Sequence, residues 1–126
     1  MTDFSELLTP TSHETGLEVE IVNPATLEGM GVFIKLAGVG SRRFREAKSK
    51  ASQYTIDKKD AGEKVDLHEV QVQMLAGLTI DWRGVKDGEK DLKFSPEKCA
   101  ELYSGSDFVF DQCSNFVNNR GNFTKG

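Results

Sequence analysis

Two stretches in the first third of the chain alternate strictly between apolar and polar residues. Residues 17–21 place leucine, valine and isoleucine on one side and two glutamates on the other, and residues 30–36 resume the same period of two. This alternation is typical of half-buried strands, and Asn23-Pro24 ends the first of them. The pattern predicts an antiparallel hairpin over residues 17–37. Because a two-stranded hairpin is marginally stable in water, we expect the helices that follow to cover its apolar face.

Beyond residue 40 the apolar positions recur at the spacing of helices. Ser41, Asp66 and Ser95 stand where a side chain can accept hydrogen bonds from a first helical turn, and Pro96 suits a first helical position. Periodicity and capping together predict four helices, over residues 41–55, 66–78, 95–103 and 106–118. The polar residues 57–64 predict a mobile connector.

These elements predict an α+β fold that is mainly helical, with an N-terminal two-stranded antiparallel β-hairpin packed against three to four short α-helices. We expect residues 17–126 to form a single domain. Residues 1–16 are polar and show no sustained period, so we interpret them as a flexible leader in which only Phe4, Leu7 and Leu8 are able to dock.

The length and composition are those of one small soluble domain. The chain has 126 residues, and none of its apolar runs approaches the roughly twenty residues of a membrane span. It begins acidic and lacks the basic and apolar regions of a secretory signal. We therefore expect a cytosolic location and no membrane partner.

The formal charge of −4 conceals an uneven distribution. Residues 35–59 hold eight basic side chains and two acidic ones, whereas the rest of the chain holds eight basic and eighteen acidic. This pattern favours docking on an acidic protein partner or on the acidic part of another copy, although an ordinary solvated surface gives it too. Nucleic-acid binding is the weaker interpretation, because the chain is acidic overall and Tyr54 is the one exposed aromatic candidate in the basic segment.

The sequence contains no pattern that predicts catalysis, a metal or a cofactor. Cys99 and Cys113 lack a nearby histidine or third cysteine at metal-ligand spacing, and His13 and His68 are far apart in the sequence. The glycine-rich residues 38–41 lie between a strand and a helix, but they match neither phosphate-binding motif. We expect buried, reduced cysteines and a protein that is not an enzyme.

Several short motifs occur in a fixed order along the chain. They are Val19 to Thr26 (V-E-I-V-N-P-A-T), Gly38-x-Gly40-Ser41-Arg42-x-Phe44-Arg45, Leu78 to Gly84 (L-T-I-D-W-R-G), Phe94-Ser95-Pro96-Glu97, and Asn122-Phe123. In this order and at this length they resemble the small tail assembly chaperones of long-tailed bacteriophages. The resemblance spans roughly residues 17–123.

The resemblance implies a function without catalysis. Such chaperones coat the tape measure protein, keep this long helical chain soluble, and help recruit tail tube subunits as the tube polymerises. They act in the cytoplasm of the host bacterium, are absent from the finished virion, and in many phages are also made in a longer, frameshifted form. We also expect self-association into an oligomer, because a protomer with one basic and one acidic part suits head-to-tail contacts.

Two other classes of function remain open at this point. One is a minor structural protein of the virion, such as a head–tail connector or tube component. The other is a small regulator that binds nucleic acid. The residues that we expect to bind a partner come from the basic helix and from the late aromatic motifs: Arg42, Arg43, Phe44, Arg45, Lys48, Tyr54, Trp82 and Phe123. The narrow apolar stripe of the basic helix either lines a groove for that partner or covers the hairpin.

Overall fold

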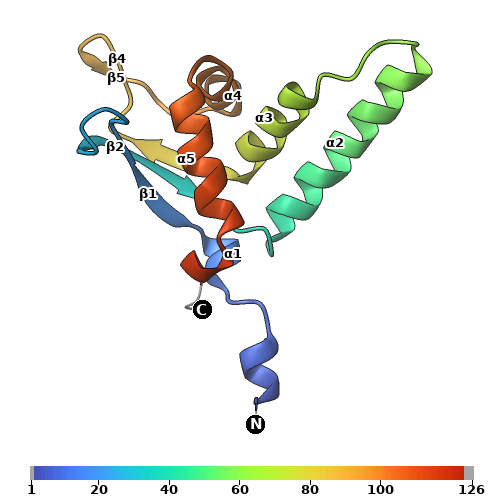
Figure 1. Ribbon diagram of the computed structural model, residues 1–126, viewed down its shortest axis with the longest axis horizontal. Coiled ribbons are helices and arrows are strands. Elements are labelled where there is room, and N and C mark those ends of the chain that lie inside the picture. Colours follow the sequence, from blue (N-terminus) through green and yellow to red (C-terminus); the bar gives the residue numbers. More distant parts are fainter. Residues whose placement is uncertain (1, 124–126) are drawn as a thin grey trace.

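A three-stranded antiparallel sheet lies at the centre of the fold, which a computed structural model describes for residues 2–123 (Figure 1). Its strands are β1 (Leu17–Val22), β2 (Gly29–Leu36) and β3 (Thr79–Arg83), in the order β1-β2-β3. The hairpin predicted over residues 17–37 is confirmed. The expected sheet of two strands is wrong, because β3 follows a helix directly and pairs with β2, which is far away along the chain.

Helices make up most of the remainder of the described chain. They are α1 (Ser12–Thr15), α2 (Arg42–Asp60), α3 (Leu67–Leu78), α4 (Pro96–Gly105) and α5 (Asp107–Asn118), with the 3-10 helices η1 (Phe4–Leu7) and η2 (Arg120–Asn122) and a small hairpin of β4 (Lys86–Asp87) and β5 (Lys90–Asp91). The four helices that the sequence predicts beyond residue 40 are all present. The mixed fold class is therefore confirmed.

Helix α2 is longer than the sequence predicts. We expected it to end near residue 55 and to be followed by a connector over residues 57–64, but it continues to Asp60. Lys58, in its last turn, forms an ion pair with Glu63 at 2.7 Å and lies where a cation interacts favourably with the helix dipole. These polar contacts extend the helix without an apolar face, so periodicity does not reveal them.

One face of the sheet is buried, and α3, α4 and α5 cover it. The core side chains come from these three helices and the sheet: Ile21, Ile34, Leu36, Val72, Leu75, Trp82, Cys99, Tyr103, Val109, Cys113 and Val117. The sequence left open whether the apolar stripe of the helix over residues 41–55 covers the hairpin or lines a groove, and the structure does not place this helix over the hairpin. Apart from Phe44, which packs against the core, α2 lies beside the sheet and packs mainly on α3 (Figure 1).

The second half of the expected leader is part of the body. His13 is 1% exposed; its carbonyl accepts a hydrogen bond from Gly38 N–H and its Nδ1 accepts one from Gly40 N–H, both at 2.9 Å. Its ring also packs on Phe123, with 4.8 Å between ring centroids. The flexible-leader interpretation of residues 1–16 is therefore wrong for this half. Its contacts come from a single buried imidazole, and one residue produces no apolar periodicity in the sequence.

The same segment sets the start of α2. Ser41 Oγ accepts a hydrogen bond from Phe44 N–H at 3.1 Å, and a Glu14 carboxylate oxygen accepts one from Arg42 N–H at 2.7 Å. The negative charge of Glu14 at the helix N-terminus offsets the unfavourable arginines of the first turn. A Cβ on Gly38 would overlap the His13 ring, so this turn requires glycine there.

We predict that acid destabilises the protein through His13. Burial, and secondarily the charge of Arg120, lower its pKa below the ordinary value of 6.5, against the opposing effect of Glu14. The unfolded chain therefore binds the proton more readily, so this contribution to stability is complete above about pH 6.5 and is lost as the pH falls toward the folded-state pKa. Urea unfolding between pH 7.5 and 5 measures the loss.

The variant His13→Gln removes the titrating group, so its unfolding midpoint should depend less on pH than that of the natural protein. The matched control is His68→Gln, which changes an exposed histidine that lies against the edge of Phe110. Equal pH dependence in the His13→Gln variant and the natural protein would contradict the prediction.

Candidate partner-binding groove

Helices α2 and α3 enclose a groove of about 680 Å³ between them. Its volume lies within the range of about 300–1,000 Å³ that is usual for clefts that bind ligands. Its floor is built from small and apolar residues of four neighbouring parts of the fold: Ala47, Ala51 and Tyr54 of α2, Val70, Ala76 and Gly77 of α3, Ile80 of β3, and Phe94 and Pro96 before and at the start of α4. We call this the α2–α3 groove.

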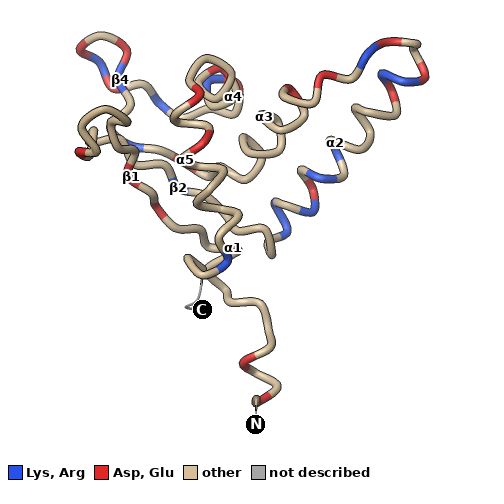
Figure 2. Tube along the Cα trace, viewed as in Figure 1, with Lys and Arg blue, Asp and Glu red and all other residues tan. Residues whose placement is uncertain are grey.

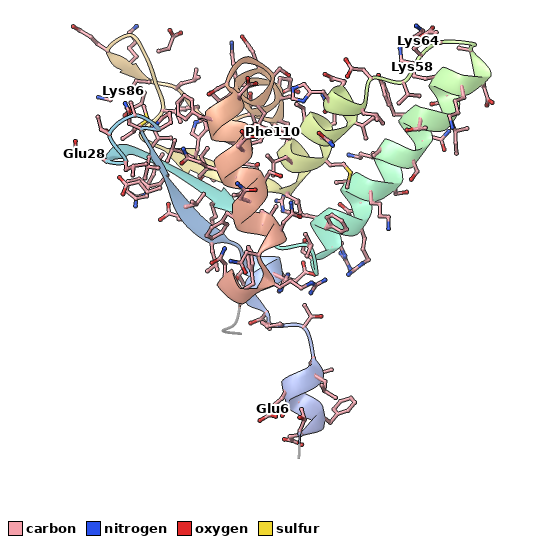
Figure 3. All side chains as sticks on the ribbon, in the orientation of Figure 1. Glu6, Glu28, Lys58, Lys64, Lys86 and Phe110 are labelled. Carbon is pink, nitrogen blue, oxygen red and sulfur yellow. The ribbon has the colours of Figure 1, made fainter. Side chains whose placement is uncertain are left out.

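A contact between two small residues fixes one end of the groove. Ala47 is 7% exposed, and a Cβ added to Gly77 would lie 2.9 Å from the Cβ of Ala47. A glycine inside a helix costs about 1 kcal/mol relative to alanine, so this close approach explains its presence in α3. From this contact the two helices move apart toward the connector of residues 61–66 (Figure 1). Lys58 and Lys64 lie near that far end (Figure 3).

Charged side chains stand along the edges of the groove. Arg43, Glu46 and Lys50 of α2 lie on one side, and Glu69 and the amide of Gln73 on the other. Figure 2 shows basic residues gathered along the first half of α2. Within residues 2–123, none of its first five basic side chains takes part in a salt bridge: Arg42, Arg43, Arg45, Lys48 and Lys50. This half of the helix therefore carries an excess of positive charge, which Glu14 and Glu46 offset only in part.

The structure divides the expected partner-binding residues of α2 into three groups. Arg43 and Tyr54 line the groove. Arg42, Arg45 and Lys48 are exposed on α2 but are not part of the lining. Phe44 is half-buried and packs against the core.

Trp82 and Phe123, which we also expected to bind a partner, are buried and pack within the described part of the chain. Trp82 is 7% exposed, and its Nε1 donates a hydrogen bond to the Leu92 carbonyl at 2.8 Å. It also meets the Phe94 ring edge-on. Phe123 is 1% exposed and lies between the rings of His13 and Phe116. Aromatic residues near turns can be core anchors or exposed anchors, and the sequence does not distinguish the two.

Sequence reasoning missed the half of the groove that α2 does not supply. Val70 is in α3, Ile80 in β3 and Phe94 in the loop before α4, and nothing in their spacing indicates a shared surface. Two large exposed apolar residues were missed as well: Ile56 on α2, which is 51% exposed, and Leu67 at the start of α3, which is 72% exposed. The tertiary fold alone brings Val70, Ile80 and Phe94 together in one lining.

The groove offers binding surface and little reactive chemistry. Both cysteines lie in the core, and burial raises the pKa of Cys99 and raises that of Cys113 to about 12. A thiol is nucleophilic as the thiolate, so these groups stay unreactive. Among residues 2–123, no three His, Cys, Asp or Glu side chains are grouped to hold a metal ion. In the same range, no helix has the length and hydropathy needed to cross a membrane.

The close contact at Gly77 gives a stability prediction. The variant Gly77→Leu should lower the free energy of unfolding by about 1–3 kcal/mol, because the new side chain must displace Ala47 and push α2 away. Gly105→Leu is the control, since a Cβ on Gly105 meets nothing within 4 Å. Urea unfolding monitored by circular dichroism measures both, and equal midpoints would show that α2 does not depend on this contact.

No protein-family model matches the chain, and no significant match was found among the curated proteins or among the solved structures.

Proposed function

We propose that this protein is a tail assembly chaperone of a long-tailed bacteriophage or prophage, and that it binds helical segments of the tape measure protein in the α2–α3 groove. The groove is the observation that carries the proposal, because it is an open, mostly apolar surface beside a long helix that packs mainly on α3. The ordered motifs described above supply the class of protein. In this structure the residues of these motifs have packing roles: Gly38 and Gly40 accommodate His13, and Trp82 and Phe123 are buried in the core.

A helical partner fits the shape of this site. An amphipathic helix inserts apolar side chains at positions i, i+3 and i+4 into a groove between two other helices. The α2–α3 groove has the required lining, with Tyr54 and Phe94 as aromatic contacts and Ala47 and Ala51 leaving room for the backbone to approach. Such a groove conceals the apolar face of the partner from water, which is what a chaperone for an aggregation-prone helical chain must do.

The charge on α2 suits this role. The basic residues of its first half would attract acidic stretches of a long helical partner, which raises the rate of encounter more than the final affinity. The groove itself is lined by charges of both signs, so it suits helices that carry both acidic and basic residues beside their apolar face. The expected roles that follow are solubilisation of the tape measure protein and recruitment of tail tube subunits, without a catalytic step.

Co-expression tests the partner and the groove together. The tape measure protein from the same gene cluster should stay soluble and co-purify with this chain. The variant Ala51→Glu places a charge in the groove and should lower the amount that co-purifies by about tenfold or more. The control Ser52→Glu adds the same charge to the next residue of α2, which is exposed and outside the lining, and should behave like the natural protein.

Circular dichroism of each variant establishes that α2 and α3 remain folded. Equal loss of co-purification in the two variants would mean that binding does not use the groove. A tape measure protein that stays insoluble with the natural chain would overturn the proposed function.

A virion inventory separates this function from a structural role in the particle. Mass spectrometry of purified virions should find tube and tape measure proteins and little or none of this chain, because an assembly chaperone leaves before the tail is complete. Abundant presence in mature particles would instead support the connector or tube-component alternative.

A further inference from the structure

Residues 2–8 form an exposed arm at the N-terminal side of α1. All seven residues are exposed, and every hydrogen bond that they make within residues 2–123 is to another residue of the arm. Contact with the body begins at Thr9, which lies against Gly40. Figure 1 shows the arm projecting from the body on the side away from α2 and α3. Figure 3 shows Glu6 on this arm, far from the other labelled side chains.

The arm has the side chains of a short amphipathic helix. Phe4, Leu7 and Leu8 stand at positions i, i+3 and i+4 and are 74%, 73% and 56% exposed. Residues Phe4–Leu7 already form the 3-10 helix η1, which a capping box between Asp3 and Glu6 holds at its start. An ordered helical turn with three exposed apolar side chains is the arrangement that docks into a groove between helices.

We propose that the arm of one copy binds in the α2–α3 groove of a second copy. The apolar residues of the arm match the apolar residues that line the groove. The arm has two acids and no base, and the α2 edge of the groove carries Arg43 and Lys50 together with a single acid, Glu46. The acidic side of η1 therefore faces α2 when Phe4 and Leu7 point to the floor.

The direction of the arm favours docking in the groove of a second copy over docking in the groove of the same chain. The arm leaves the body at the turn before α2 and extends away from the groove, so docking in the same chain requires the segment after it to reverse direction (Figure 1). That segment, residues 9–16, is held by His13 and Glu14. A contact between two different surfaces is heterologous, so each bound copy still offers an arm and a groove to others.

The arm and a partner helix then compete for one groove. This consequence rests on the proposed function, whereas the contact between copies does not. In the free protein, the arm shields the groove from water and from unwanted contacts. A longer helix with more apolar anchors displaces it, which couples loss of self-association to binding of the partner.

Sedimentation of the purified chain alone tests the contact. The natural protein should form dimers or larger species with rising concentration. The triple variant Phe4→Ser, Leu7→Ser, Leu8→Ser should weaken association by about 30-fold or more, as removal of buried anchors does. The control Leu27→Ser, Met30→Ser removes two exposed apolar residues, one in the β1–β2 loop and one at the start of β2, and should associate like the natural protein.

Charge reversal tests which face of α2 is used. Arg43→Glu with Lys50→Glu should weaken association, and Arg45→Glu with Lys48→Glu, on the same helix but outside the groove, should not. Adding Asp3→Lys and Glu6→Lys to the first pair should restore association. The arm variant mixed with the groove variant should give a heterodimer and nothing larger, because each supplies one intact surface.

A natural protein that stays monomeric at all concentrations would overturn the proposal, as would loss of association in the Arg45 and Lys48 control or no loss in the arm variant. A monomer whose arm cross-links to the groove of its own chain would also overturn it. None of these experiments contains the tape measure protein, so their failure leaves the co-expression result, and the proposed function, to be judged separately.

Discussion

The buried imidazole of His13 holds together three parts of the chain that are distant in sequence. It accepts a hydrogen bond from the turn after β2, packs on Phe123 near the other end of the described chain, and anchors the segment that precedes β1. The turn that it holds sets the direction of α2, because Ser41 and Glu14 cap the helix directly beside it. The start of α2, and with it one boundary of the α2–α3 groove, is therefore set beside this side chain, and packing on α3 positions the rest of the helix.

The core leaves α2 incompletely covered. The sheet has one buried face, and α3, α4 and α5 occupy it, so a fourth long helix has no room there. A helix of this polarity gains most of its stability from its packed stripe, here the narrow stripe against α3. Its remaining surface stays available for partners. The arm of residues 2–8 is left out of the body in the same way, and the two exposed surfaces are complementary in apolar character and in charge.

Periodicity and capping located the main elements of this fold. Alternation placed β1 and β2, and Asp66 and Ser95 marked the starts of α3 and α4, because these signals act within a few residues. The apolar stripe of α2 was also visible in the sequence, but the element on which it packs was not. The hairpin and α3 both have apolar faces, so a local pattern cannot show which of them the stripe contacts. The basic residues of α2 lie beside the groove, whereas Trp82 and Phe123, also expected to bind a partner, are buried.

The sequence by itself determined the hairpin, the four main helices and the uneven charge. Tertiary structure alone decided that β3 joins the sheet, that residues 12–16 belong to the body, and that α2 packs beside the core. The physical reason is range: capping and periodicity are set by neighbours in the chain, whereas these decisions depend on contacts between residues far apart in sequence. The His13 to Gly40 hydrogen bond and the Gly77 to Ala47 contact are two such contacts, and both follow from shape that exists only after folding.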